Sequence, residues 1–92
     1  MPLTRGETRG YFPNTTSYRF DMRDGGTEVQ CGVSSAAMDD AERATNTQNH
    51  ERDAQFARLR DRIEEVAQRK YFAGQTEQDE PRVRITTRDL NG

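Results

Sequence analysis

The sequence predicts one small two-layer α+β domain, in which an antiparallel β-hairpin and a C-terminal strand pack on one long helix. Three observations lead to this fold class. Residues 48–73 carry apolar side chains at helical spacing, and residues 17–33 form two alternating stretches joined by Asp-Gly-Gly. A third, shorter alternating stretch lies near the C-terminus. With a short helix before the long one, the predicted element order is strand, strand, helix, helix, strand.

The predicted long helix runs from Gln48 to Ala73 and is the longest patterned stretch of the chain. Its apolar residues recur at intervals of three and four: Phe56, Leu59, Ile63 and Val66. At 100° per residue these side chains share one face of a helix. Charged pairs on the other face contribute only about 0.2–0.5 kcal/mol each, so burial of the apolar face must hold the helix. Gly74 is a typical C-terminal stop.

The predicted hairpin consists of residues 17–23 and 27–33. Apolar residues alternate with polar ones in both strands: Tyr18, Phe20, Met22, Val29, Cys31 and Val33. This period of two places them on one buried face. Asp24, Gly25 and Gly26 supply the positive φ angles of a tight turn.

A weakly apolar short helix is expected from Ser34 or Ser35 to about Thr45, because serine is a favoured N-cap. Val83 and Ile85 predict a last strand that ends near Asp89. This strand is expected beside the first hairpin strand, in the spatial order 2-1-3.

Residues 1–16 are rich in Gly, Pro, Thr, Asn and charge, which predicts a mostly disordered N-terminal segment ahead of a single domain at 17–92. Tyr11, Phe12 and Pro13 are the residues expected to contact the domain edge. The chain has one cysteine, which excludes an internal disulfide, and no apolar run of membrane-spanning length. We therefore expect a cytoplasmic protein.

The charge balance gives no global attraction for nucleic acid or anionic lipid, because 16 acidic residues face 14 basic ones. Thirteen of the fourteen basic residues are Arg. Arginine suits bidentate contacts with phosphate or carboxylate, although a GC-rich genome also favours arginine codons. The composition alone leaves both explanations open.

Four segments resemble a family of short bacterial proteins, about 85–90 residues long, whose domain has no known function. They are Phe-Pro at 12–13, YRFDMRDGGTEVQCGVS at 18–34, IEEVAQRKYFAG at 63–74 and VRITTRDL at 83–90. The resemblance implies an α+β fold in a small cytosolic protein. It brings no activity, cofactor or binding residue. Residues 39–50 depart from the family pattern by having fewer large apolar side chains.

No catalytic or cofactor site is predicted. Cys31 and His50 suggest a nucleophile and a base, but the alternation of the strand places Cys31 inside. One Cys and one His provide no zinc-ligand spacing, and Asp39, Asp40 and Glu42 lack the spacing of a calcium loop. We therefore expect no metal, no cofactor and no enzymatic activity.

Two surface features remain as candidate sites. Four arginines are expected on the outer face of the sheet, where they would contact nucleic acid or another anion: Arg19, Arg23, Arg82 and Arg84. Phe72 points away from the apolar face of the long helix and is either part of the helix cap or a protein contact. The favoured function is a non-enzymatic protein-binding or regulatory module that binds an unknown partner or itself. Nucleic-acid binding through the arginines is the alternative.

Overall fold

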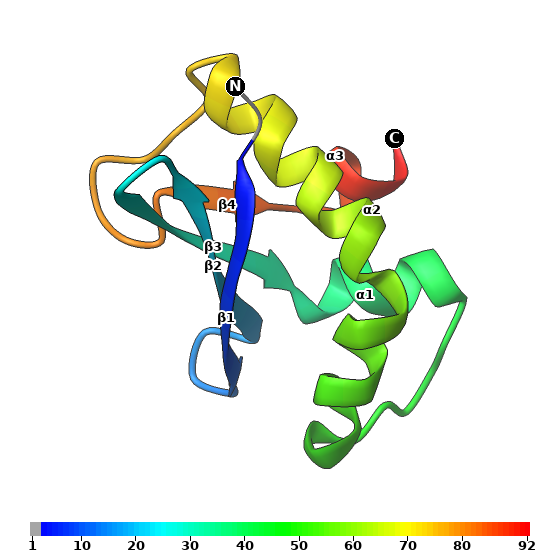
Figure 1. Ribbon diagram of the computed structural model, residues 1–92. Helices are drawn as coiled ribbons and strands as arrows, with labels where there is room; N and C mark the ends of the chain where they lie inside the picture. Colours follow the sequence, from blue (N-terminus) through cyan, green and yellow to red (C-terminus); the bar gives the residue numbers. More distant parts are fainter. Residues whose placement is uncertain (1–2) are drawn as a thin grey trace.

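The computed structural model describes residues 3–92 as a four-stranded sheet with its helices on one side (Figure 1). The elements are β1 (Thr4–Phe12), β2 (Ser17–Asp24), β3 (Thr27–Ser34), α1 (Ser35–Glu42), the 3-10 helix η1 (Asn49–Glu51), α2 (Arg52–Phe72), β4 (Val83–Ile85) and α3 (Thr87–Asn91). The sheet order is β1-β2-β3-β4. The predicted α+β class and the order of the predicted elements are confirmed.

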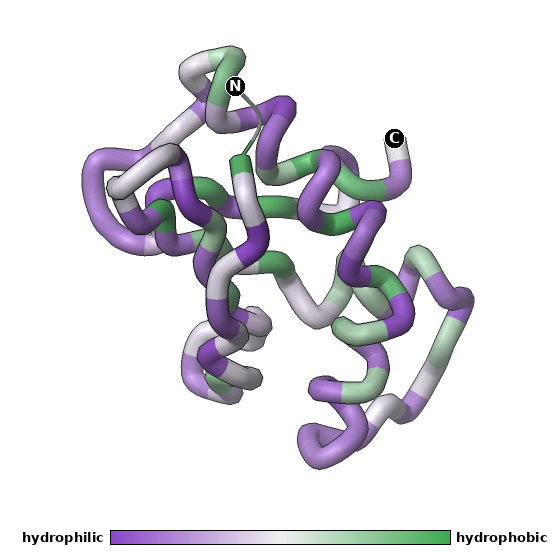
Figure 2. Tube along the Cα trace, viewed as in Figure 1, coloured by the Kyte–Doolittle hydropathy of each residue, from purple (hydrophilic) through white to green (hydrophobic). Residues whose placement is uncertain are grey.

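The hairpin forms as the alternation predicts. β2 and β3 pair antiparallel from Ser17 opposite Ser34 to Asp24 opposite Thr27, and Gly25 in the turn has a φ of 61°. The six alternating apolar residues of the hairpin are at most 3% exposed. Hydrophobic residues gather along β3 and β4 and recur along α2, whereas the loop between α2 and β4 is mostly hydrophilic (Figure 2).

Helix α2 packs on this buried face through Phe56. Its ring stacks on Tyr18 with 4.4 Å between centroids, and it contacts Phe20 at 5.0 Å. Ile63 and Val66 continue the same face of the helix into the core. The helix ends at Phe72, and Gly74 follows with a φ of 76°, as the sequence predicts.

The expectation of a disordered segment at 1–16 is wrong for the described residues, because Thr4–Phe12 forms β1. β1 pairs antiparallel with β2, and Leu3 is buried against the core. Polar contacts replace the missing apolar pattern: the Arg5 guanidinium donates to Glu64 and Asp61 of α2. Two irregularities in the register, on either side of Thr8, also disturb the alternation that identifies a strand.

The predicted neighbour of the last strand is also wrong. β4 pairs in parallel with β3, with Cys31 opposite Val83 and Val33 opposite Ile85, and not with β2. β1 already occupies the other edge of β2, so the edge of β3 is the one left for β4. β4 is short because Thr86 caps α3, where the sequence predicted continued strand.

Helix α1 ends at Glu42, earlier than the predicted Thr45, because Arg43 adopts a left-handed conformation with a φ of 53°. Ser34 is its N-cap and accepts a hydrogen bond from the Ala37 amide. Helix α2 is preceded by η1, whose N-cap Gln48 forms a capping box with Glu51. The described residues contain no helix that is both long and apolar enough to cross a bilayer.

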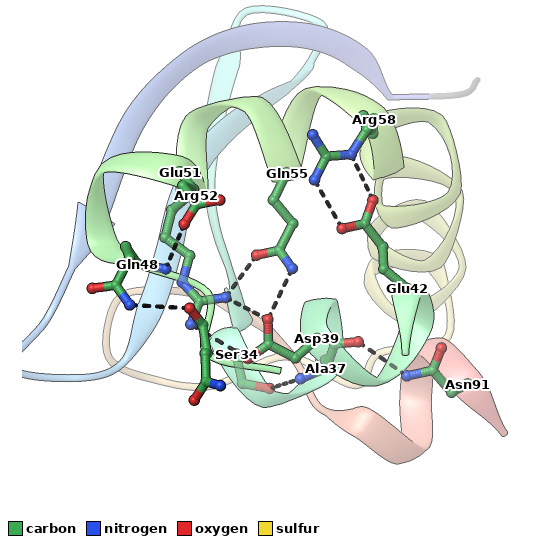
Figure 3. A network of polar contacts seen from close by, with 11 residues as sticks. Ser34, Ala37, Asp39, Glu42, Gln48, Glu51, Arg52, Gln55, Arg58 and Asn91 are labelled. Carbon is green, nitrogen blue, oxygen red and sulfur yellow. Dashed lines mark hydrogen bonds and ion pairs between the residues drawn. The ribbon is translucent and has the colours of Figure 1, made fainter. Parts of the chain in front are cut away.

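A polar network fastens α1 to the start of α2 (Figure 3). The Asp39 carboxylate accepts from Arg52 at 2.8 Å and from Gln55 at 2.9 Å, and Gln55 is completely buried. Arg58 forms a second, more exposed pair with Glu42 at 2.7 Å. Burial alone would raise the pKa of Asp39, but the hydrogen bonds from Arg52 and Gln55 outweigh it and lower the pKa below the usual 3.8.

We predict that Asp39→Asn lowers the free energy of unfolding at neutral pH by about 2–3 kcal/mol, because the Arg52 charge then lacks its counter-charge. The folded pKa of Asp39 lies below its unfolded value, so this stabilisation is present above the unfolded pKa of 3.8 and is lost as the pH falls below it. Urea unfolding at neutral and acidic pH measures the difference. Asp40→Asn, one residue along α1 and exposed, is the control. Equal stability of the two variants at neutral pH would contradict the prediction.

We also predict that the Cys31 thiol is unreactive in the native protein. Cys31 is completely buried, and burial raises its pKa to about 12, with a further contribution from the Asp21 and Glu64 carboxylates. Because the thiolate is the reactive form, a disulfide reagent at about pH 8 should modify the thiol only after denaturation. Rapid modification of the folded protein would show that Cys31 is accessible.

Candidate anion site on the outer face of the sheet

Arg19, Gly32 and Arg84 lie in one row across three neighbouring strands. Arg19 on β2 is opposite Gly32 on β3, and Gly32 is opposite Arg84 on β4. Each lies between two inward-facing apolar residues of its strand, so all three face outward. Two arginines therefore flank a position that has no side chain.

Gly32 opens a hollow between them. A Cβ atom at this position would lie 3.3 Å from Cγ of Pro81 and 3.4 Å from Cδ of Arg19, so any other residue would fill the floor. The hollow has a volume of about 170 Å³. Its lining residues are Thr15, Ser17, Arg19, Gly32, Ser34, Pro81, Arg84, Ile85 and Thr86. This lining contains two positive charges and no negative one.

Hydroxyl groups form a second row beside the guanidinium groups. Ser17 is opposite Ser34 in the sheet, and Thr86 follows Arg84 by two residues. Ser34 Oγ accepts from the Ala37 amide at 3.1 Å, which leaves its own proton free to donate. Thr86 is less available, because its hydroxyl contacts Asp89. Since Ser34 is the N-cap of α1, the positive end of that helix adjoins the hollow.

Arg19 and Arg84 make only weak polar contacts with other residues of the protein. Arg19 makes no ion pair with any of residues 3–92; its Nε donates to Ser17 at 3.3 Å, and its guanidinium carbon lies 5.3 Å from the centre of the Phe12 ring. Arg84 approaches Glu77 at 3.8 Å, and both side chains are more than half exposed. Exposed pairs of this kind contribute about 0–1 kcal/mol, so Arg84 can exchange Glu77 for a ligand.

The structure brings together two of the four predicted arginines and separates the other two. Arg23 lies opposite Glu28 in the sheet. Arg82 lines a different hollow, together with Glu28, Glu80 and two glutamines. Each of these two arginines therefore has a glutamate beside it, and neither lines the hollow between Arg19 and Arg84. Arg23 is four residues further along β2 than Arg19, and Arg82 is separated from β2 because β4 lies beside β3.

Phe72 is the last residue of α2 and is 52% exposed. Its ring makes an edge contact with Tyr71 at 5.2 Å between centroids. The side chain is therefore exposed at the end of the helix. Its two predicted roles, cap residue and protein contact, stay predictions.

The remaining chemical candidates do not form a site. Cys31 is buried in the centre of the sheet, whereas His50 is exposed in η1. Asp39 and Glu42 are engaged with Arg52 and Arg58 (Figure 3). Across residues 3–92, no three His, Cys, Asp or Glu side chains group as metal ligands.

Sequence reasoning missed two parts of the candidate site. The first is Gly32, which the alternation places outward, where the missing side chain leaves a hollow. The second is Phe12, an exposed aromatic residue next to Arg19, which was expected only to pack at the domain edge. The alternation of β3 was the available signal for Gly32, and none was available for the place of Phe12.

Comparison with solved structures shows the same fold in a crystal structure of a protein of unknown function from the DUF1488 family of Shewanella loihica PV-4. The TM-score is 0.81 and the sequence identity 12%, over 91% of each chain. At this identity the likeness concerns the fold alone. A search of curated proteins found no match.

The family model described as "Protein of unknown function (DUF1488)" matches residues 6–81, which is most of the chain. The resemblance to a family without known function is thereby confirmed. The chain belongs to the DUF1488 family.

Proposed function

We propose that this protein is a non-enzymatic binding module that binds a phosphate-bearing ligand on the outer face of its sheet. The observation that carries the proposal is the row of Arg19, Gly32 and Arg84. The sequence favoured a protein partner, but the most specific feature of the described surface is this arginine-flanked hollow.

The geometry suits a phosphate. Neighbouring strands lie about 4.8 Å apart, so the Cα atoms of Arg19 and Arg84 are separated by about 10 Å, with Gly32 between them. Two arginine side chains can converge across such a gap, and the planar guanidinium group donates in pairs to phosphate oxygens. The Ser34 hydroxyl adds a third donor at the rim.

The lining of the hollow supports binding and not catalysis. It contains no His, Cys, Asp or Glu among the described residues, so no side chain there can act as a general base or an activated nucleophile. Orientation and charge neutralisation are what the lining offers.

We predict that inorganic phosphate, titrated at low salt, shifts the backbone amide resonances of Arg19, Gly32 and Arg84 in a saturable way. Arg84→Gln should weaken this binding about tenfold or more, since it removes a charge-assisted contact from an exposed side chain. Arg82→Gln is the matched control, because it removes the same charge from the same strand region outside the hollow. Absence of shifts at Gly32, or equal effects of the two variants, would contradict the proposal.

A second candidate function is self-association through Phe72, and its support is the 52% exposure of that side chain. The side chain is large, apolar and exposed, which are the properties that a contact residue requires. The occupant we propose is a second copy of this chain.

We predict that sedimentation shows a concentration-dependent dimer and that Phe72→Ala shifts it towards monomer without changing the unfolding midpoint. Phe72 lies outside the core, so its loss should leave the fold intact. A wild-type protein that is monomeric at every concentration would overturn self-association, as would a dimer unaffected by the substitution.

A further inference from the structure

We infer that the phosphate-bearing ligand is a nucleotide, with its phosphate between Arg19 and Arg84 and its base stacked on Phe12. The inference rests on the proposed function, whose anion site it completes with a base site. The ligand supplies one phosphate and one planar base. It is either a free nucleotide or one nucleotide of a single strand.

Phe12 provides an aromatic surface next to the anion site. It is 44% exposed, even though its ring also contacts the Arg19 guanidinium at 5.3 Å. Arg19 thus connects the anion site and the base site, because it lines the hollow and contacts the Phe12 ring. Bases stack on aromatic rings and on arginine planes in single-strand recognition, and this pair offers both.

The turn that follows Phe12 fixes the backbone that carries the ring. The Thr15 amide donates to the Phe12 carbonyl and the Thr16 amide to the Pro13 carbonyl, both at 3.2 Å. The Thr16 carbonyl in turn accepts from the Ser35 amide at 2.9 Å, at the start of α1. The aromatic surface is therefore attached to the same frame as the hollow, and little ordering is required when a ligand binds.

The charges of the sheet limit the contact to about one nucleotide. Away from the hollow, the outer side of the sheet carries the exposed Glu28 and the buried Asp21, which pair with Arg9 at 3.0 and 2.8 Å. Arg82 shares its own hollow with Glu28 and Glu80. A long phosphate backbone would approach these carboxylates, whereas one phosphate at the Arg19–Arg84 row would not.

The base site consists of the Phe12 ring and the Arg19 guanidinium beside it, and both of these groups bind a base through its flat face. We therefore expect the four nucleoside monophosphates to bind with similar affinities, ordered by their stacking strength.

The test compares adenosine 5′-monophosphate with ribose 5-phosphate by calorimetry, using the full chain. We expect the nucleotide to bind about fivefold tighter or more, which is the low end of what one stacked base contributes. Phe12→Ala should abolish this difference while leaving the affinity for ribose 5-phosphate unchanged. Phe12→Tyr is the matched variant, because it keeps an aromatic ring at this position and should retain the difference. Unfolding midpoints of both variants establish that they fold.

The outcomes separate the two proposals. If ribose 5-phosphate binds as tightly as the nucleotide, the anion site stands and the nucleotide inference is overturned. If neither binds, both proposals fail. If the nucleotide advantage survives Phe12→Ala, the base lies elsewhere and the inference is overturned.

A labelled single-stranded oligonucleotide distinguishes the two sources. Binding tighter than that of the mononucleotide, with a slope of log affinity against log salt of about −0.7 to −1.4, would support a strand that contacts one or two phosphates. Weaker binding than that of the mononucleotide would support a free nucleotide. A slope of about −3 would overturn the inference, since it would require all four arginines to contact phosphate.

Discussion

The stacking of Phe56 on Tyr18 and Phe20 is the contact on which the rest of the structure depends. It fixes which face of β2 is buried, because both partners of Phe56 come from that strand. A shift of the register by one residue would turn every side chain of the strand to the opposite face. Arg19, which lies between the two aromatic residues, is therefore held on the outer face by the packing of the inner one. The packing of the core therefore determines that Arg19 faces the candidate site.

The position of β1 then determines the form of the site. If β4 had paired with β2, as the sequence predicted, Arg19 and Arg84 would lie on neighbouring strands, with no glycine between them. Since β1 occupies that edge, β4 pairs with β3 and Gly32 lies between the arginines. Because Gly32 has no side chain, the two arginines stand on either side of a hollow. The N-terminal strand thus shapes a hollow that contains none of its residues, while its last residue, Phe12, lies beside Arg19.

The predictable parts of this fold are those with a short-range apolar period. The hairpin and α2 follow from the alternation around Phe20 and Cys31 and from the helical spacing around Ile63. β1 could not be recognised in this way, because ion pairs of Arg5 with Glu64 of α2 and of Arg9 with Asp21 of β2 hold it. The outward direction of the arginines was predictable from alternation, but their grouping depended on a strand order that no local pattern encodes.

The bias towards arginine does not by itself distinguish codon usage from function, but the environment of each arginine is informative. Arg52 and Arg58 pair with carboxylates of α1, and Arg60 pairs with Glu64 within α2. The first two pairs join α1 to α2 and the third lies within α2, so these three arginines have structural roles.

Arg19 is different, because it is partly buried, faces a hollow and has no carboxylate partner among residues 3–92. A cation in such a place loses hydration and gains no counter-charge from the protein. An anion from outside supplies that counter-charge, and the row of Arg19, Gly32 and Arg84 leaves the space in which it can bind.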